Sequence, residues 1–176
     1  AGDTQKFRLE GSLRERKWYQ AWLTYDAQTS KLTLGKAILD PGLKSEDQTG
    51  SSTDYAFESV SQEIPFLIGA QLSGSIVSHF NGKLEEPKIF SRSLDQQEIE
   101  QAFSGKIPDG LLARWDFSRE IPTSRMIDLG PENLEGYLVN CPARGMTGSN
   151  WKGKEMCWRH APEDYGAIHF LSLIHI

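Results

Sequence analysis

The sequence predicts an all-β fold, an antiparallel β-sandwich that carries one short helix. Three observations lead to this class. Short segments rich in aromatic and β-branched residues recur along the 176 residues, and turn signals separate them. Only residues 95–105 carry a full set of helix signals. The regular alternation of strand and helix that predicts a parallel sheet does not occur.

The first predicted structure is an antiparallel hairpin. Residues 18–25, WYQAWLTY, read as one strand, and residues 31–39 return as the second. The polar segment 26–30 between them predicts the turn. Residues 40–54 combine Pro-Gly with clustered Ser and Thr, so we expect a long loop there.

The predicted helix has a well-marked beginning and end. Asp95 is a good N-cap residue, and Glu98 stands three residues later, where its carboxylate can reach the free N–H of the cap. Ile99, Ala102 and Phe103 follow at helical spacing and form one apolar stripe, before Gly105 ends the helix.

Short strands are expected on both sides of this helix. Before it, residues 66–70 predict a buried strand, residues 72–78 a Gly- and Ser-rich connection, and Pro87 an edge position or a bulge in the strand that precedes the helix. After it, residues 111–117 place apolar side chains on one face of a strand, and residues 122–133 are mostly turn.

The last third of the chain is richer in loops. Residues 136–139 and 167–170 predict short strands, and residues 141–166 predict a long loop-rich stretch. That stretch contains three large aromatic residues, Trp151, Trp158 and Tyr165. They are candidates either for packing against a neighbouring domain or for stacking on a sugar.

Composition excludes several functions. The formal net charge is −5 and the basic residues are scattered, which disfavours nucleic acid as a partner. No apolar run approaches the length of a membrane span. Cys141 and Cys157 give neither a disulfide framework nor zinc-site spacing, so we favour free thiols over a bonded pair.

The side chains that could carry chemistry do not form a recognisable catalytic set. The four histidines show no metal-ligand spacing, although His169 could face an active site in a following domain. Glu85 and Glu86 are adjacent on a strand and therefore point to opposite faces, which disfavours a glycosidase pair. Calcium ligation by Asp40, Asp47 and Asp54 lacks the order of an EF-hand loop. We therefore predict no catalytic residue and no metal site in this chain.

Two separated motifs in the first part resemble the laminin-G-like (concanavalin A-like) jelly roll. The first is the Trp-Tyr-x-Ala-x-x-x-Tyr-Asp run of residues 18–26, followed by a Leu-x-Leu return. The second is residues 80–94, FNGKLEEPKIFSRSL, closed by Glu98-Ile99. The resemblance covers roughly residues 1–104, and Pro87 stands where an aliphatic residue is usual. It implies that the helix closes the domain.

The second part resembles the junction region of the N,N-dimethylformamidase large (β) subunit and its relatives. The matching residues include Trp115-Asp116-Phe117-Ser118, Asp128, Gly136, Asn140-x-Pro142-x-Arg144, Gly148, Trp151, Trp158 and Tyr165-Gly-Ala-Ile-His-Phe170. The resemblance implies an amide hydrolase with a mononuclear iron site built from Tyr, Glu and His in a downstream α/β domain. No ligand of that site can be assigned to a residue of this chain.

These inferences give one organisation and two functional hypotheses. We expect a jelly roll over residues 1–105, a connector over 106–170 that begins the next domain and could complete the sandwich, and a non-native tail over 171–176. The first hypothesis is a non-catalytic β-sandwich fragment that contacts its own downstream catalytic domain and a small subunit, with iron only in that domain. The alternative is a carbohydrate-binding module that uses Trp151, Trp158 and Tyr165. The resemblance favours a cytoplasmic location.

Overall fold

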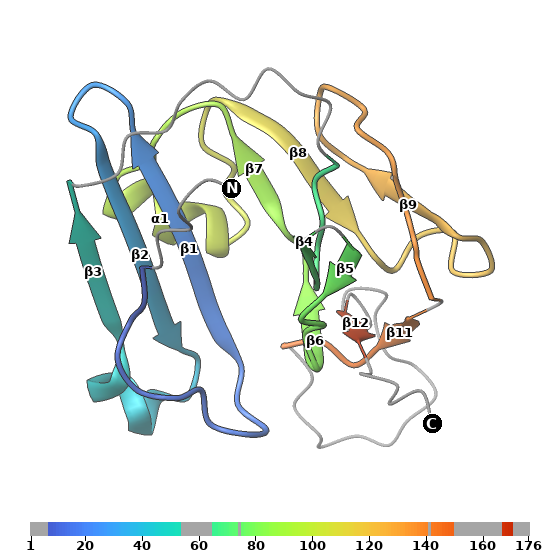
Figure 1. Ribbon diagram of the computed structural model, residues 1–176, viewed down its shortest axis with the longest axis horizontal. Helices are drawn as coiled ribbons and strands as arrows, with labels where there is room; N and C mark the ends of the chain where they lie inside the picture. Colours follow the sequence, from blue (N-terminus) through green and yellow to red (C-terminus); the bar gives the residue numbers. More distant parts are fainter. Residues whose placement is uncertain (1–6, 54–64, 74, 141, 150–166, 171–176) are drawn as a thin grey trace. The chain divides into compact units, whose positions relative to one another are not determined.

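The computed structural model describes residues 7–53, 65–73, 75–140, 142–149 and 167–170 (Figure 1). Most elements are strands in antiparallel sheets, and the described residues contain a single α-helix, so the predicted all-β, sandwich-like fold class is confirmed. The chain divides into two compact units: unit 1 contains residues 1–60 and 90–110, and unit 2 contains residues 61–89 and 111–176. The predicted boundary at residue 105 stays a prediction. None of the helices in the described part is long and apolar enough to cross a membrane.

The predicted hairpin of unit 1 is confirmed. Strands β1 (Tyr19–Asp26) and β2 (Lys31–Ile38) pair over their full length in one antiparallel register. The Asp26 carboxylate accepts hydrogen bonds from the main-chain N–H of Gln28 and the hydroxyl of Thr29, which fixes the turn. Gly35 lies opposite Trp22, and the indole ring lies so close to it that a Cβ at position 35 would collide with the ring.

The prediction of a loop over residues 40–54 was wrong for most of its length. Residues Pro41–Glu46 form a 3-10 helix, η1, capped by Asp40, and Gln48–Ser52 form strand β3, which pairs with β2. The polar, Gly-containing sequence of β3 has little to bury. It forms a strand because the free edge of β2 supplies main-chain hydrogen bonds. The residue types of β3 alone do not indicate that such a partner is present.

The helix of unit 1, α1 (Gln96–Phe103), has the predicted ends. Asp95 Oδ1 accepts from Glu98 N at 2.8 Å, and Glu98 Oε2 accepts from Asp95 N at 3.0 Å, so the capping box is complete. At the other end Gly105 has φ of +85°, and the N–H of Lys106 donates to Gln101 O at 2.9 Å, a helix-ending bond that the left-handed glycine allows.

Unit 2 begins with a second correction. Residues 66–70 are not a strand; the strands follow at β4 (Gln71–Ser73) and β5 (Ser75–Val77), which pair with each other where a plain connection was expected. The apolar residues instead pack by their side chains. Phe66 stacks on Trp115 with ring centres 5.9 Å apart, and Ile68 packs against the core.

The predicted interruption at Pro87 is visible in unit 2. The chain forms β6 (Gly82–Glu85), then Glu86 adopts φ of +47°, and β7 (Lys88–Phe90) follows Pro87. The two strands belong to different sheets, because β6 pairs with β12 while β7 joins β8. The break at Pro87 therefore lets the chain change partners.

The core of unit 2 lies on the predicted strand β8 (Leu111–Asp116) and the residue after it. Ala113 and Phe117 are 0% exposed and Trp115 is 6% exposed, which is the alternation expected for one buried face. The sheet order is β10-β9-β8-β7. Strand β10 (Gly136–Tyr137) is a shorter version of the predicted strand. Residues 122–133 are mostly turn and irregular structure, as predicted, but they also contain the short strand β9 (Arg125–Asp128), which the sequence did not predict.

A third sheet joins distant parts of the sequence. Strand β12 (Ala167–Phe170) was predicted, and it pairs with β6 and with β11 (Ala143–Met146), in the sheet order β11-β12-β6. Strand β11 lies in the stretch expected to be loop-rich. Its four residues, Ala-Arg-Gly-Met, contain no β-branched or aromatic residue that would predict a strand, and its partner lies more than twenty residues further along the chain.

Candidate functional site

The residues predicted to bind sugar lie outside the described part of the structure. Trp151, Trp158 and Tyr165 all fall there, as do Cys141 and Cys157, so their roles stay predictions. Of the predicted histidine candidates, His169 has its main chain in β12, opposite Lys83 of β6.

The two adjacent glutamates of the first part have different structural partners. Glu85 Oε2 accepts from Ser149 N at 2.9 Å, beside Gly148, where a Cβ would collide with the carboxylate. Glu86 instead accepts from Lys88 Nζ at 2.8 Å and from Arg114 Nε at 2.6 Å. Burial opposes ionisation of Glu86, but these two cations outweigh it and lower its pKa. Each carboxylate holds a neighbouring segment in place.

The described aspartates of the calcium hypothesis are also engaged. Asp40 forms an ion pair with Lys17 at 2.5 Å and caps η1, and the hydrogen bond from Lys17 is the main reason that its pKa is lowered. Asp47 Oδ1 accepts from Ile38 N at 2.7 Å. Asp54 lies outside the described residues. Within the described ranges no three His, Cys, Asp or Glu side chains are grouped so that they could hold a metal ion.

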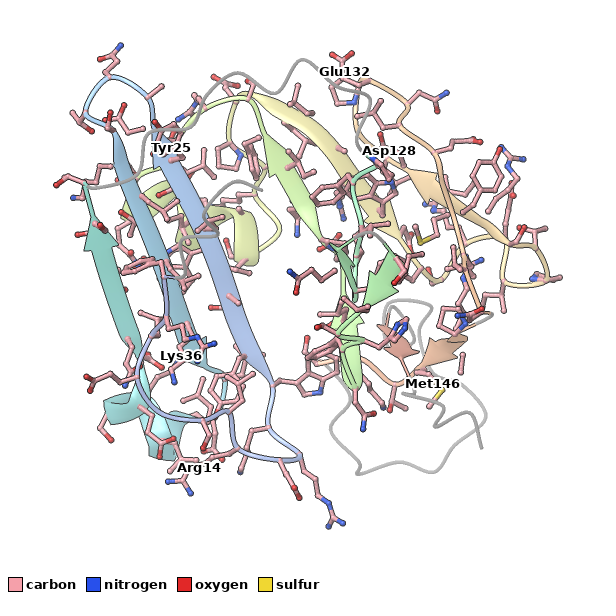
Figure 2. All side chains as sticks on the ribbon, in the orientation of Figure 1. Arg14, Tyr25, Lys36, Asp128, Glu132 and Met146 are labelled. Carbon is pink, nitrogen blue, oxygen red and sulfur yellow. The ribbon has the colours of Figure 1, made fainter. Side chains whose placement is uncertain are left out.

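Asp128 is the acidic residue most firmly built into unit 2. It ends β9 beside β8, is only 6% exposed, and is labelled in Figure 2. Its carboxylate accepts three main-chain hydrogen bonds of 2.7–2.8 Å, from the N–H groups of Arg114, Gly130 and Leu134. Burial raises the pKa of Asp128, but the three donors outweigh burial and the net pKa is lowered. The ionised carboxylate thus fastens the 129–134 turn to β8.

Arg144 has the opposite role on β11. Its guanidinium donates to the main-chain carbonyl oxygens of the turn that follows β8, namely those of Phe117, Arg119, Glu120, Thr123 and Arg125. Burial lowers its pKa, which the charges of Asp116 and Glu120 partly oppose. A guanidinium stays protonated at neutral pH even so, and the positive charge here is solvated by peptide dipoles.

Residues 121–139 of unit 2 include several large apolar side chains that are exposed. A hollow of about 280 Å³ is lined by Ile121, Leu138 and neighbouring residues. Leu138 packs against the core, so strand alternation turns Tyr137 and Val139 outward, where they are 69% and 61% exposed. Ile121 is 46% exposed and Leu134 is 50% exposed. We call these four exposed residues, Ile121, Leu134, Tyr137 and Val139, the 121–139 apolar surface. Large apolar side chains that are exposed in this way are candidates for a contact with another protein surface.

Unit 1 contains a second hollow, which the sequence did not predict. It measures about 370 Å³ and is lined by residues of β1, β2, η1, β3 and α1, including Gln20, Trp22, Gln96 and Phe103. The Trp22 and Phe103 rings meet edge to face at 6.3 Å. The Trp22 Nε1–H is buried and finds no acceptor among the described residues. The hollow therefore combines aromatic faces and amide side chains with four charged residues, Lys36, Lys44, Asp47 and Glu100.

Comparison with known proteins finds similarity to proteins that are much longer than this chain. No family model matches the sequence. The chain is 30% identical over 192 aligned positions to an N,N-dimethylformamidase beta subunit from Alcaligenes sp, and this alignment takes in 97% of the chain and 25% of the relative. A beta subunit of the same name from Paracoccus aminophilus is 39% identical over 101 positions, or 53% of the chain and 13% of that protein. The chain is related to the beta subunit of N,N-dimethylformamidase. It spans about a quarter of the length of the Alcaligenes relative, or less in the second case.

The relation to N,N-dimethylformamidase beta subunits extends over both units of the chain, because 97% of it aligns. Asp128, Arg144 and Gly148 were among the residues that carried the resemblance in the sequence, but no role could be assigned to them there. The structure gives each a supporting role: Asp128 and Arg144 hold turns, and Gly148 leaves room for Glu85.

Proposed function

We propose that this chain is a non-catalytic β-sandwich part of an N,N-dimethylformamidase large-subunit-like amide hydrolase, and that it contacts a catalytic domain or another subunit. The observation that carries the proposal is the extent of the similarity. Almost the whole chain aligns with a protein named as a subunit of an enzyme, yet the alignment takes in only a quarter of that protein.

The hydrogen bonds and ion pairs of the acidic side chains in unit 2 support a scaffold role. Glu85, Glu86, Asp116 and Asp128 each accept hydrogen bonds or ion pairs from residues of unit 2, so their charges serve to hold segments together. A general acid or base needs a group that can reach a substrate and exchange a proton near neutral pH. The lowered pKa values of Glu86, Asp116 and Asp128 keep these carboxylates ionised instead.

The 121–139 apolar surface is the contact region in this proposal. Interfaces are enriched in Tyr and in other large apolar side chains at their centre, with charged residues at the rim. Tyr137 lies opposite Arg125 in the β9–β10 ladder, and Arg125 is bound to Glu135 at 2.6 Å. The arrangement of an exposed aromatic residue beside a paired charge fits this pattern.

Catalysis belongs to a downstream domain in this proposal. The family resemblance implies a mononuclear iron site there with Tyr, Glu and His ligands, and none of those ligands is assigned to this chain. The proposal includes a laminin-G-like jelly roll as the finer description of the fold.

The first test is to read the encoding gene to its stop codon and to assay the products. We expect the frame to continue into an α/β domain with clustered Tyr, Glu and His. The complete product should release dimethylamine from N,N-dimethylformamide, and the isolated 176-residue chain should not. A stop codon directly after the chain, or amide hydrolysis by the isolated chain, would contradict the proposal.

A second candidate function, carbohydrate binding, is favoured by the hollow in unit 1. Aromatic faces together with amide side chains suit a sugar ring, which has apolar faces and hydroxyl edges. Binding of the 176-residue chain to a glycan array would test it. If Trp22→Ala abolishes glycan binding, the hollow of unit 1 is the binding site. If Trp151→Ala, Trp158→Ala or Tyr165→Ala abolishes it, the site contains the aromatic residues that the sequence predicted.

A further inference from the structure

The turn between β8 and β9 surrounds the guanidinium of Arg144 with main-chain carbonyl oxygens. Main-chain carbonyl oxygens of five residues converge on the guanidinium of Arg144, which reaches them from β11. The Nε–H donates to Phe117 O at 3.1 Å. One terminal nitrogen donates to Arg125 O at 2.9 Å, Thr123 O at 3.2 Å and Glu120 O at 3.3 Å, and the other donates to Arg119 O.

This convergence needs the cation. Carbonyl oxygens carry partial negative charge, so several of them aimed at one point repel one another unless a positive group lies between them. Rings of carbonyl oxygens replace the hydration shell of a cation in the same way in ion-selective sites. A guanidinium suits this turn better than an ammonium because it is planar and has five N–H donors in a fixed geometry.

We infer that residues 117–125 form a guanidinium-binding site built from main-chain carbonyl oxygens, which the chain fills with its own Arg144. The site orders the turn that carries Ile121. Residues of this turn line the 280 Å³ hollow. Asp116 and Glu120 add negative charge nearby, but the guanidinium donates its hydrogen bonds to the five carbonyl oxygens. The ligand class is therefore a planar cation recognised by neutral acceptors.

Chemical rescue tests the inference in the 176-residue chain. In Arg144→Ala, amide hydrogen exchange of Thr123 and Arg125, whose N–H groups donate to Glu120 O and Thr123 Oγ1, should become faster by about tenfold or more, because the turn opens when its cation is removed. Low-millimolar guanidinium should restore much of the protection, whereas methylammonium or potassium at the same concentration should not. Arg144→Lys should protect the turn less than the wild type, because its ammonium is compact and has three donors.

The matched control is Arg119→Ala. Arg119 lies in the same turn and its side chain is 59% exposed in an ion pair with Asp116, so guanidinium should leave the exchange of this variant unchanged. Unchanged exchange in Arg144→Ala, no rescue by guanidinium, or equal rescue by potassium would each overturn the inference.

A measurement on the wild type covers the case in which Arg144→Ala does not fold. The Nε–H and terminal N–H hydrogens of Arg144 should exchange with water more slowly than those of Arg119 in an NMR experiment, and rotation of the guanidinium should be hindered. Equal exchange for the two arginines would contradict the site. None of these results depends on whether the chain belongs to an amide hydrolase.

Discussion

Unit 1 and unit 2 are both antiparallel β structures, but they draw on contacts at different distances along the sequence. In unit 1 the hairpin of β1 and β2 joins neighbouring segments, and α1 is defined by its own capping box. In unit 2 strand β6 pairs with β12, whose residues lie more than eighty positions further on. Local contacts cost little chain entropy to form, whereas distant ones need a buried core and specific side-chain bonds to be retained.

Two charged side chains of unit 2, the buried Asp128 and the partly buried Arg144, show how such distant or irregular segments are held. Asp128 is surrounded by three main-chain N–H donors, and Arg144 by main-chain carbonyl acceptors. Peptide groups in a turn lack the hydrogen-bond partners that a regular β-ladder supplies. Each of these two side chains supplies such partners instead. Unit 1 uses the same device at its helix start, but between residues only three positions apart. This difference predicts that single substitutions in unit 2 lower the free energy of unfolding by more than comparable substitutions in unit 1.

The largest expected effect comes from the core of unit 2. Phe117→Ala removes a side chain that is 0% exposed, and we expect a loss of about 3–5 kcal/mol in the free energy of unfolding. Phe103→Ala, at a position 38% exposed in unit 1, should cost clearly less. Urea unfolding measures both. Hydrogen exchange would show whether unit 1 keeps its protection in Phe117→Ala; loss of protection in both units would mean that they unfold as one.

The next effect in size comes from Asp128. Asp128→Ala leaves three main-chain N–H groups without their acceptor, which should cost about 2–4 kcal/mol. Asp128→Asn keeps the shape but has one acceptor oxygen and no charge, so its loss should be somewhat smaller. If Asp128→Ala lowers the free energy of unfolding by less than the same substitution at an exposed aspartate such as Asp109, the 129–134 turn does not depend on the Asp128 carboxylate.

Asp128 also predicts a pH dependence. Its pKa is lowered in the folded state, so its stabilising contribution is fully present above the unfolded value of about 3.9 and is lost as the pH falls towards the folded value. The difference in stability between wild type and Asp128→Asn should therefore shrink below about pH 4. A difference that stays constant from pH 6 to pH 3 would contradict this prediction.

A smaller effect is expected at the helix start of unit 1. Asp95→Ala removes the N-cap acceptor and should cost about 1 kcal/mol. The partner Glu98 has its pKa lowered to about 2, first by its hydrogen bond to Arg92 and then by the N–H of Asp95. Its contribution should be present above its unfolded pKa and decline as the pH falls towards 2. Circular dichroism at pH 7 and pH 2.5 would follow it, with Glu98→Gln as the control that lacks the titration of Glu98.

The smallest effect is expected at the 121–139 apolar surface. Tyr137→Ser and Val139→Ser change side chains that are 69% and 61% exposed, so the isolated chain should lose less than about 0.5 kcal/mol. If the chain is part of a longer polypeptide, as the proposed function requires, the same double variant of that polypeptide should assemble less well, as judged by gel filtration and thermal unfolding. Leu23→Ser, 63% exposed in unit 1, is the matched control. Equal behaviour of the two variants would remove the surface from the proposal.

The sequence predicted those elements whose causes lie within a few residues. The Asp95–Glu98 capping box, the Asp26 turn and the alternation of Ala113, Trp115 and Phe117 all act over short distances, and all three are present in the structure. The resemblance to N,N-dimethylformamidase subunits could also be seen in the sequence, because it rests on the order of separated motifs. The sugar-binding candidates stay predictions, since Trp151, Trp158 and Tyr165 lie outside the described residues.

The tertiary structure alone decided which weakly patterned segments became strands and which charged residues became supports. Strands β3, β9 and β11 contain few residues with strong strand preference, and they form because a neighbouring strand offers main-chain hydrogen bonds. Residues 66–70 have a strand-like sequence but form no strand; Phe66 stacks on Trp115, and Ile68 packs against the core. The roles of Asp128 and Arg144 likewise depend on where distant peptide groups converge. Such convergence is a property of the folded backbone, and the residue types alone do not specify it.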